Sequence, residues 1–159
     1  MISLRGVREQ FPHMPEDVFE QWIAPLVEID GWPLGAEKSD NIFMGEPLSY
    51  WSNAKWLLIK RPFNRVCFAP RSQLLATDIL LHAINGTQTD VAQVKNTVHR
   101  FRACTEFICR YPYFPKPVIG RFTPDGLELV DGHHRLASVL ALSPIEGFIL
   151  DAWIVHENS

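Results

Sequence analysis

The five residues from 131 to 135, Asp-Gly-His-His-Arg, bring together side-chain types that bind anions and move protons. They follow a short apolar run over 127–130, which is typical of a strand, and precede an apolar run over 136–142, which is typical of a helix. A glycine between a strand and a helix lets the backbone approach a ligand, and the positive end of the helix dipole favours an anion. The sequence therefore predicts a strand-to-helix turn that holds an anion such as phosphate.

Each polar side chain of this turn has a role that phosphate chemistry could use. Arg135 offers a bidentate fork to phosphate oxygens, beside the N–H groups of Gly132 and His133. Asp131 repels a phosphate, but it suits a divalent cation that bridges phosphates, or a general base. His133 and His134 exchange protons near neutral pH, and as neighbours they cannot both point the same way. We expect ligand binding by Gly132, His133, His134 and Arg135, and catalysis by Asp131, His133 and His134.

The alternative for this turn is a structural one. Asp-Gly is a common turn dipeptide, and a pair of histidines at a helix start can serve only to cap backbone groups. A zinc site built on Asp131, His133 and His134 is less expected, because consecutive residues cannot easily converge on one tetrahedral ion.

The elements around the turn alternate between strands and helices, which indicates the α+β class. Apolar periodicity predicts helices over 70–84 and 89–111, and a short strand over 65–68. A hairpin is expected from strands 118–122 and 127–130 around Pro124-Asp125-Gly126, followed by a helix over 136–142 and a buried strand over 148–155. We expect a small mixed sheet flanked by helices, in a domain over residues 61–159.

The first sixty residues are predicted to form a helical and irregular extension, residues 1–60. A helix should start at Pro15 and be kinked or ended by Pro25. The stretch 31–50 is dense in Gly and Pro and is expected to be irregular. Its aromatic residues need cover, which either the main domain or a protein partner, including a second copy of the chain, could provide.

Charge is distributed unevenly along the chain. Formal charges are −4 over residues 1–60, +6 over 61–122 and −5 over 123–159. Helical spacing over 89–111 places Lys95, His99 and Arg102 in one basic stripe, with Arg100 nearby. We expect these four residues to contact the phosphate backbone of DNA, and the alternative is a solvated helix face.

Composition excludes several classes of protein. No apolar run approaches the ~20 residues that a membrane-spanning helix needs, and the first thirty residues carry many charges, so a cytoplasmic protein is expected. The three cysteines form no Cys-x-x-Cys pair, which argues against a disulfide framework or a zinc site. We expect them to be small buried side chains.

The segment 117–155, above all Val130-Asp-Gly-His-His-Arg-Leu-Ala137, resembles the ParB/sulfiredoxin superfamily. Sulfiredoxins place a catalytic cysteine where this chain has His133, so sulfinic-acid reduction is not expected. ParB partition proteins use a Gly-Glu-Arg-Arg motif to bind CTP, and a helix-turn-helix domain follows that motif, so DNA partitioning is not expected either. The Asp-Gly-His-His-Arg motif is closer to that of ParB-like predicted nucleases and of free-serine kinases that use ATP or ADP with magnesium. It also resembles a plasmid fertility-inhibition protein described as an ATPase and DNase.

The resemblance implies an enzyme that binds a nucleotide. The leading hypothesis is a metal-dependent phosphohydrolase that uses ATP, or another nucleoside triphosphate, and Mg²⁺ held by Asp131, with possible DNA binding and DNase activity. The first alternative is an ATP- or ADP-dependent small-molecule kinase, for which Asp78 is a candidate carboxylate. The second is a non-catalytic adaptor or inhibitor that grips a protein partner through the aromatic N-terminal segment.

Overall fold

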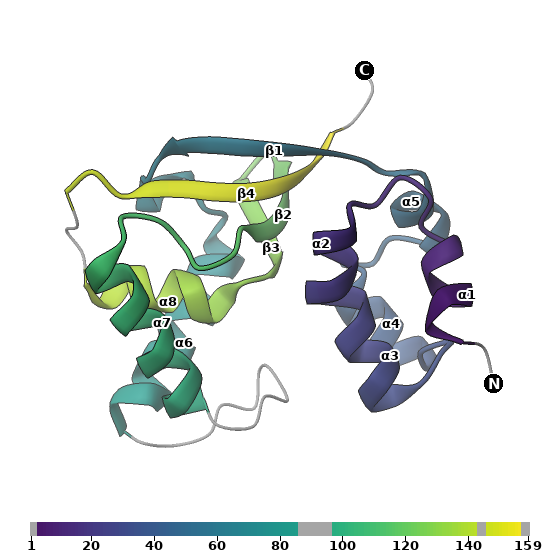
Figure 1. Ribbon diagram of the computed structural model, residues 1–159, viewed down its shortest axis with the longest axis horizontal. Helices are drawn as coiled ribbons and strands as arrows, with labels where there is room; N and C mark the ends of the chain where they lie inside the picture. The colour runs from purple at the N-terminus through teal and green to yellow at the C-terminus, as the bar shows by residue number, and fades with distance from the viewer. Residues whose placement is uncertain (1–2, 86–96, 143–145, 157–159) are drawn as a thin grey trace. The chain divides into compact units, whose positions relative to one another are not determined.

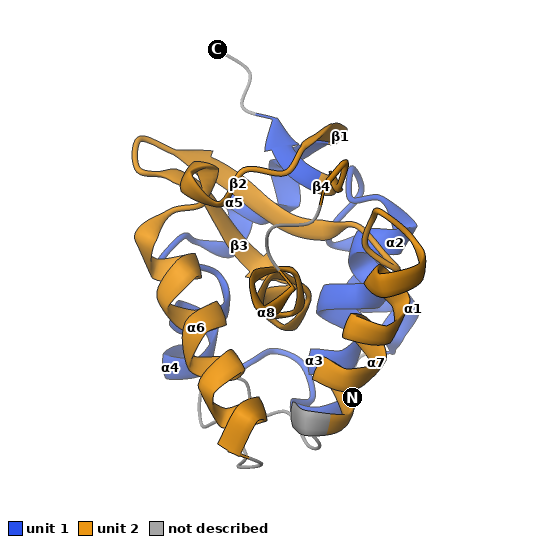
Figure 2. Cartoon of the chain, turned by 90° about the vertical axis from the view of Figure 1, so that its left-hand side faces the viewer, with its two compact units in different colours: residues 1–57, 153–159 blue, residues 58–152 orange. Residues whose placement is uncertain are grey.

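The computed structural model describes residues 3–85, 97–142 and 146–156. The chain divides into two compact units, one of residues 1–57 with 153–159 and one of residues 58–152, which Figure 2 shows in two colours. The division falls inside strands β1 (Lys55–Pro62) and β4 (Ile149–His156). The sequence had placed one boundary at residue 60 and had assigned the last strand wholly to the second domain.

The second unit has the α+β class that the sequence predicted. Strands β2 (Val118–Thr123) and β3 (Gly126–Asp131) join β1 and β4 in a four-stranded sheet of order β1-β4-β2-β3. Helices α6 (Pro70–Asn85), α7 (Thr97–Arg110) and α8 (His133–Ala141) lie on one side of this sheet (Figure 1). No helix of the described segments is long and apolar enough to cross a membrane.

The β2–β3 hairpin positions the end of β3, where the candidate site begins. The two strands pair antiparallel, with Phe122 opposite Leu127 and Thr123 opposite Gly126. Leu127 and Leu129 of β3 are almost fully buried, and the backbone N–H of Leu129 donates to the hydroxyl of Ser72 on α6 at 2.9 Å. The hairpin is therefore fixed to α6 by both packing and a buried hydrogen bond.

Helix α8 is the central helix of the second unit. Its Leu136, Ala137 and Val139 are at most 1 % exposed, because α6 and α7 pack against it. Figure 2 shows α8 nearly end-on between these two helices. The buried side chains of Ile79 on α6 and Ile108 on α7 complete this core. Burial of the whole apolar face fixes the orientation of the first turn of α8, which carries the candidate site.

Two predicted elements of this unit differ from the structure. Residues 65–68 were expected to be a strand, but Arg65–Cys67 form a 3-10 turn, because the side chain of Asn64 accepts a hydrogen bond from the N–H of Val66 at 3.1 Å. The strand lies earlier instead, as β1. Helix α8 begins at His133, three residues before the predicted start, so both histidines are helical.

The first unit is more helical than expected. It contains α1 (Leu4–Glu9), α2 (Glu16–Val18), α3 (Ala24–Asp30), α4 (Ala36–Ile42) and α5 (Leu48–Asn53). The segment 31–50 is therefore not an irregular arm. Pro25 does not end its helix either, because a π-helical turn at Phe19–Ile23 directly precedes α3 and Pro25 occupies the start of α3, where its missing N–H is tolerated.

The aromatic residues of the first unit form its core. Trp22 packs edge-on against Phe43 and Trp51, with ring centroids 5.8 and 5.0 Å apart. Trp51 is fully buried, and its indole N–H donates to the carbonyl of Phe43 at 2.9 Å. These rings are covered within their own unit, which is neither of the two alternatives that the sequence suggested. A protein partner or homodimer contact through this unit stays a prediction.

Candidate functional site

The turn from Asp131 to Arg135 joins β3 to α8 through a glycine that the fold itself requires. Gly132 has a positive φ of 110°, a conformation that side chains other than glycine rarely adopt. A Cβ atom at this position would also lie 2.6 Å from Cγ1 of Val118 on β2. The glycine is therefore explained by backbone geometry and close packing, whether or not a ligand binds.

Arg135 is engaged with the protein. Its Nη1 donates to the carbonyl oxygens of Lys116 and Pro117 at 2.9 and 2.8 Å, and its Nη2 donates to Oδ2 of Asp131 at 2.8 Å. Only 15 % of the side chain is exposed. The guanidinium thus holds the start of α8 against the chain that enters β2. Bidentate binding of phosphate by Arg135 stays a prediction. The contacts observed give the Arg135 guanidinium a structural role.

Asp131 is the last residue of β3 and the ion-pair partner of Arg135. Burial raises the pKa of its carboxyl above the usual range, while the charge and hydrogen bond of Arg135, the charge of Arg100 and the N–H of Gly132 act in the opposite direction. About a third of the side chain is exposed.

The surroundings of Asp131 do not fit a magnesium ion held by the protein. Mg²⁺ requires near-octahedral oxygen ligands, and this carboxylate already accepts from Arg135 and Gly132. The described part of the chain holds no group of three or more His, Cys, Asp and Glu side chains placed to bind a metal. Magnesium bound to Asp131 therefore stays a prediction from resemblance, and we derive no chemical step through it.

His133 and His134 are the two residues of the turn that the fold does not explain. Nε2 of each imidazole is buried and makes no hydrogen bond with any described residue. A buried polar atom without a partner is costly, so such atoms commonly mark a place where something else binds. The N-cap residue of α8 is Gly132, which has no side chain to cap the helix, and capping by the histidine pair stays a prediction.

The two imidazoles are neutral at physiological pH. Burial lowers the pKa of His133 to about 4, and the positive charges of Arg71, His134 and Arg135 add to this effect. Burial, followed by the charges of Arg100 and Arg135, lowers the pKa of His134 to about 4 as well. The charge of Arg71 on α6 acts on His133, and the charge of Arg100 on α7 acts on His134.

The charge of Arg71 acts on His133, an influence that the sequence did not reveal. Arg71 lies in the first turn of α6, where the positive end of the helix dipole makes a cation unfavourable. This unfavourable placement was the sequence signal that could have pointed to Arg71, because a residue that disagrees with its local structure often has a role in the site around it. Arg100 on α7, predicted only as a DNA contact, also acts through its charge on Asp131 and His134. The charges of two guanidinium groups on separate helices therefore act on the histidine pair.

The remaining nucleic-acid candidates lie on the surface of α7 or outside the described residues. His99, Arg100 and Arg102 are exposed on α7. Lys95 falls among residues 86–96, which the structure does not describe, so the full predicted stripe is not tested. The alternative of a solvated basic face also remains.

The cysteines differ from one another. Cys104 on α7 is buried, and burial raises the pKa of its thiol despite a hydrogen bond with Ser138 and the charge of Arg135. It therefore stays a protonated core side chain, as predicted. Cys67 and Cys109 are exposed, so the expectation that they are buried is wrong. Ser138, fully buried on α8, also donates to the carbonyl of His134 at 2.9 Å and so supports the first turn.

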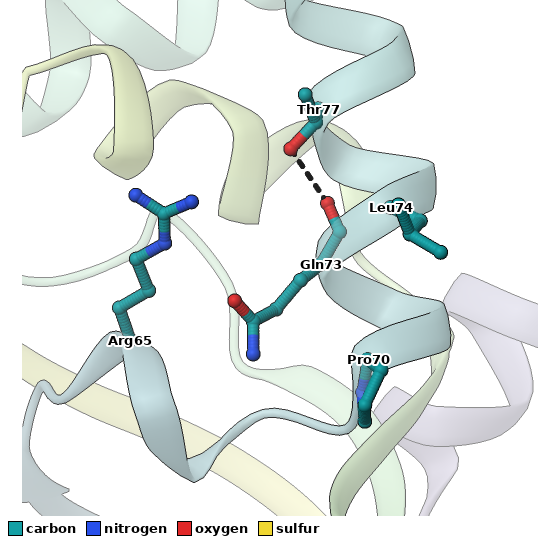
Figure 3. Close-up of a pocket in the computed structure, with 5 residues that line it drawn as sticks. All are labelled: Arg65, Pro70, Gln73, Leu74 and Thr77. Atoms are coloured by element: carbon teal, nitrogen blue, oxygen red, sulfur yellow. Dashed lines mark hydrogen bonds between the residues drawn. The ribbon is translucent and has the colours of Figure 1, made fainter.

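A surface hollow lies between the 3-10 turn and the start of α6. Arg65 and Gln73 project into it from facing sides, with Pro70, Leu74 and Thr77 completing the lining (Figure 3). The Gln73 side chain donates to the carbonyl of Phe68 at 2.8 Å, and the Thr77 hydroxyl to the carbonyl of Gln73. None of the lining residues belongs to the 131–135 turn, and the polar groups of the hollow are largely engaged with backbone.

Comparison of the chain with protein-family models, with curated proteins and with solved structures gives no match. The resemblance to the ParB/sulfiredoxin superfamily therefore rests on the motif at 130–137 and on the order of the elements around it.

Proposed function

We propose that the turn binds the phosphate group of a nucleotide and that the protein is a phosphohydrolase. One observation carries this proposal, namely the two buried Nε2 atoms of His133 and His134 that lack hydrogen-bond partners, in a place where the charges of Arg71 and Arg100 act on the imidazoles. Guanidinium groups pair with phosphate oxygens, and neutral imidazoles can accept or donate a hydrogen bond at the same group. The motif and its resemblance to ATP-using relatives favour a nucleoside triphosphate such as ATP.

In the proposed reaction the imidazoles handle the proton and the arginines handle the charge. A neutral imidazole accepts a proton from the water that attacks phosphorus, while the bond from phosphorus to the leaving oxygen breaks. Arg71 and Arg100 stabilise the negative charge that spreads over the phosphoryl oxygens. The pair Asp131–Arg135 keeps the turn in shape and does not take part directly. DNA cleavage would use the same groups on a phosphodiester.

No observation raises the alternatives above this proposal. The carboxylate that a kinase would need, Asp78, lies 3.6 Å from Nε2 of His82 one turn further along α6, in an ordinary surface pair. Phe43 and Trp51, two of the rings that an adaptor would present, are buried in the core of the first unit.

The test is a calorimetric titration of the whole chain with ATP, CTP and ADP, each with magnesium and with a chelator. His133→Ala, His134→Ala, Arg71→Ala and Arg100→Ala should each weaken binding by roughly one to two decades, since a charge-assisted contact contributes about 1.5–3 kcal/mol. His13→Ala is the matched control, because His13 is an exposed histidine of the first unit. If the wild-type chain binds none of the three nucleotides at millimolar concentration, the proposal is wrong.

A further inference from the structure

Three aromatic rings form an exposed cluster where α7 ends. Phe107 lies in the last turn of α7 and Tyr111 directly follows that helix, with ring centroids 4.8 Å from each other. Tyr113 lies just beyond the helix, with its ring 5.8 Å from that of Phe107 and 5.7 Å from that of Tyr111. We call these three residues the aromatic platform. Tyr111 is 44 % exposed and Tyr113 is 41 % exposed, so the two tyrosine rings present large apolar surfaces to solvent.

The platform is held rigidly by residues that are not part of it. Tyr113 forms an isolated parallel bridge with Ile149, whose N–H donates to the carbonyl of Pro112 at 2.8 Å. The next residue, Phe114, is 2 % exposed and packs edge-on against Phe148 with centroids 5.1 Å apart. Phe114 fills the core next to the platform, and the two tyrosine rings lie at the surface beside it. A rigid, exposed aromatic surface costs little entropy when it binds.

The surroundings of the platform are basic. Residues 97–122 contain five Lys and Arg residues but one acidic residue, Glu106. Arg110 precedes Tyr111 directly, Lys116 follows Tyr113 by three residues, and both are exposed. Exposed aromatic rings beside concentrated positive charge are complementary to a ligand with flat rings on a phosphate chain.

The platform also lies in line with the candidate site. Arg100 and Phe107 are seven residues apart on α7, and Tyr111 follows the helix four residues after Phe107 with its N–H bonded to the Phe107 carbonyl, so the three residues follow one stripe along α7 and its C-terminal end. At 1.5 Å per residue, Phe107 is about 10 Å and Tyr111 about 16 Å along the helix from Arg100. Arg100 in turn acts on Asp131 and His134 of the turn. A chain of nucleotides bound along this stripe would place one phosphate near the turn and later bases on the platform.

We propose that Phe107, Tyr111 and Tyr113 form a base-stacking platform for single-stranded nucleic acid, with Arg110 and Lys116 contacting its backbone. This inference deepens the proposed function by naming a polymeric single strand as the ligand that extends from the turn. Stacking needs unpaired bases, since in a duplex the faces of the bases are already covered by their neighbours. The platform therefore selects single strands over duplexes, which phosphate contacts by α7 alone would not do.

The experiment measures fluorescence anisotropy of labelled oligo(dT) of twenty nucleotides and of a duplex of the same length, in 50 mM and 200 mM salt. The wild type should bind the single strand more tightly. Tyr111→Ala/Tyr113→Ala should lose roughly 5- to 100-fold in single-strand affinity, because each stacked base contributes at that level. Tyr111→Phe/Tyr113→Phe keeps both rings and should stay within about threefold of the wild type.

Two controls separate stacking from charge and from general effects on the surface. Phe122→Ala removes a ring that is 45 % exposed but lies on β2 outside the platform, and it should leave affinity unchanged. Arg110→Ala and Lys116→Ala should each lower the slope of log affinity against log salt by about 0.7. Thermal melts of all variants confirm that each is folded under the assay conditions.

The proposal is overturned if the wild type does not bind the single strand at low salt, if it prefers the duplex, or if the double alanine variant binds as tightly as the wild type. Titration of the same double alanine variant with ATP reports on the turn alone. Loss of oligo(dT) binding with unchanged ATP binding supports the platform. Retained oligo(dT) binding in a chain that binds no ATP would count against the turn and leave the platform standing.

Discussion

Nη2 of Arg135 lies 2.8 Å from Oδ2 of Asp131, one helical turn earlier, and joins the first turn of α8 to the end of β3. The same guanidinium binds the carbonyl oxygens of Lys116 and Pro117, which lead into β2. One side chain thus connects three segments around Gly132. The two outer residues of the motif shape the turn, and the Nε2 atoms of the two histidines between them make no hydrogen bond with the described residues.

Replacing Arg135 should therefore cost stability as well as function. Arg135→Ala leaves a carboxylate and two carbonyl groups without their donor, and loss of one partner of a largely buried ion pair costs about 3 kcal/mol. The matched control is Arg5→Ala, which removes an equally spaced pair with Glu9 whose side chains are 91 % and 72 % exposed. That change should cost at most about 0.5 kcal/mol. Urea unfolding followed by circular dichroism measures both, and equal small losses would show that Arg135 is not structural.

Gly132 allows a sharper test of the turn. Gly132→Ala combines a positive φ with a Cβ 2.6 Å from Val118, and we expect a loss of about 2–5 kcal/mol. Gly45 also has a positive φ, but a Cβ there would meet no atom within 4 Å. Gly45→Ala should therefore lose only the stability that backbone strain costs, about 1 kcal/mol. Gly35→Ala has neither feature and should be neutral within about 0.5 kcal/mol.

A second substitution, at Val118, tests how much of the loss comes from the steric clash with a Cβ at position 132. Val118→Ala in the Gly132→Ala background removes the clashing methyl groups and should recover part of the loss. If Gly132→Ala melts at the wild-type temperature, the turn adapts freely and the close packing described above does not constrain it.

The sequence predicted those elements whose pattern is local. The hairpin around Pro124-Asp125-Gly126 and helix α6 carry their periodicity and turn residues within a few positions, and both are confirmed. Strand β1 was missed because only Ile59 of its eight residues is buried, so no alternating pattern marks it. It is a strand because it pairs with β4 far along the chain, and local sequence contains no trace of that pairing.

The candidate site divides in the same way. Asp131 to Arg135 could be found because all five residues are adjacent. The contacts of these residues could not be predicted, since Arg135 donates to the backbone of Lys116 and the charge of Arg71 acts on His133 from another helix. Such encounters follow from how α6, α7 and α8 pack, and only the three-dimensional structure reveals them.

The core of the first unit should depend on one indole. Trp51→Ala removes a fully buried ring from the cluster with Trp22 and Phe43, and a loss of about 3–5 kcal/mol is expected. Trp51→Phe retains a ring but leaves the carbonyl of Phe43 without its donor, so an intermediate loss is expected. Ile29→Ala, at a side chain 74 % exposed in the same unit, should change little. Near-ultraviolet circular dichroism and thermal melting distinguish these outcomes.

The histidine pair should make the protein sensitive to mild acid. In the unfolded chain both imidazoles have a pKa near 6.5, whereas in the native state burial and the neighbouring arginines hold each pKa at about 4. Above pH 6.5 both states are neutral and the pair has no effect. Between pH 6.5 and 4 the unfolded state takes up protons that the native state refuses, so stability falls as pH falls. The loss levels off below pH 4 at about 3 kcal/mol for each imidazole.

Asp131 changes stability with pH in the opposite direction to the two histidines. The contribution of the histidines must therefore be measured as the difference between the wild type and a variant that lacks them. Because its native pKa is raised, the native state binds a proton there before the unfolded state does, and falling pH adds stability through this group. Urea unfolding at half-unit steps from pH 7.5 to 4, for the wild type and for His133→Asn/His134→Asn, cancels this contribution. The wild type should lose stability more steeply than the variant between pH 6.5 and 4. Parallel curves would mean that the imidazoles are solvated and that their Nε2 atoms are not reserved for a ligand.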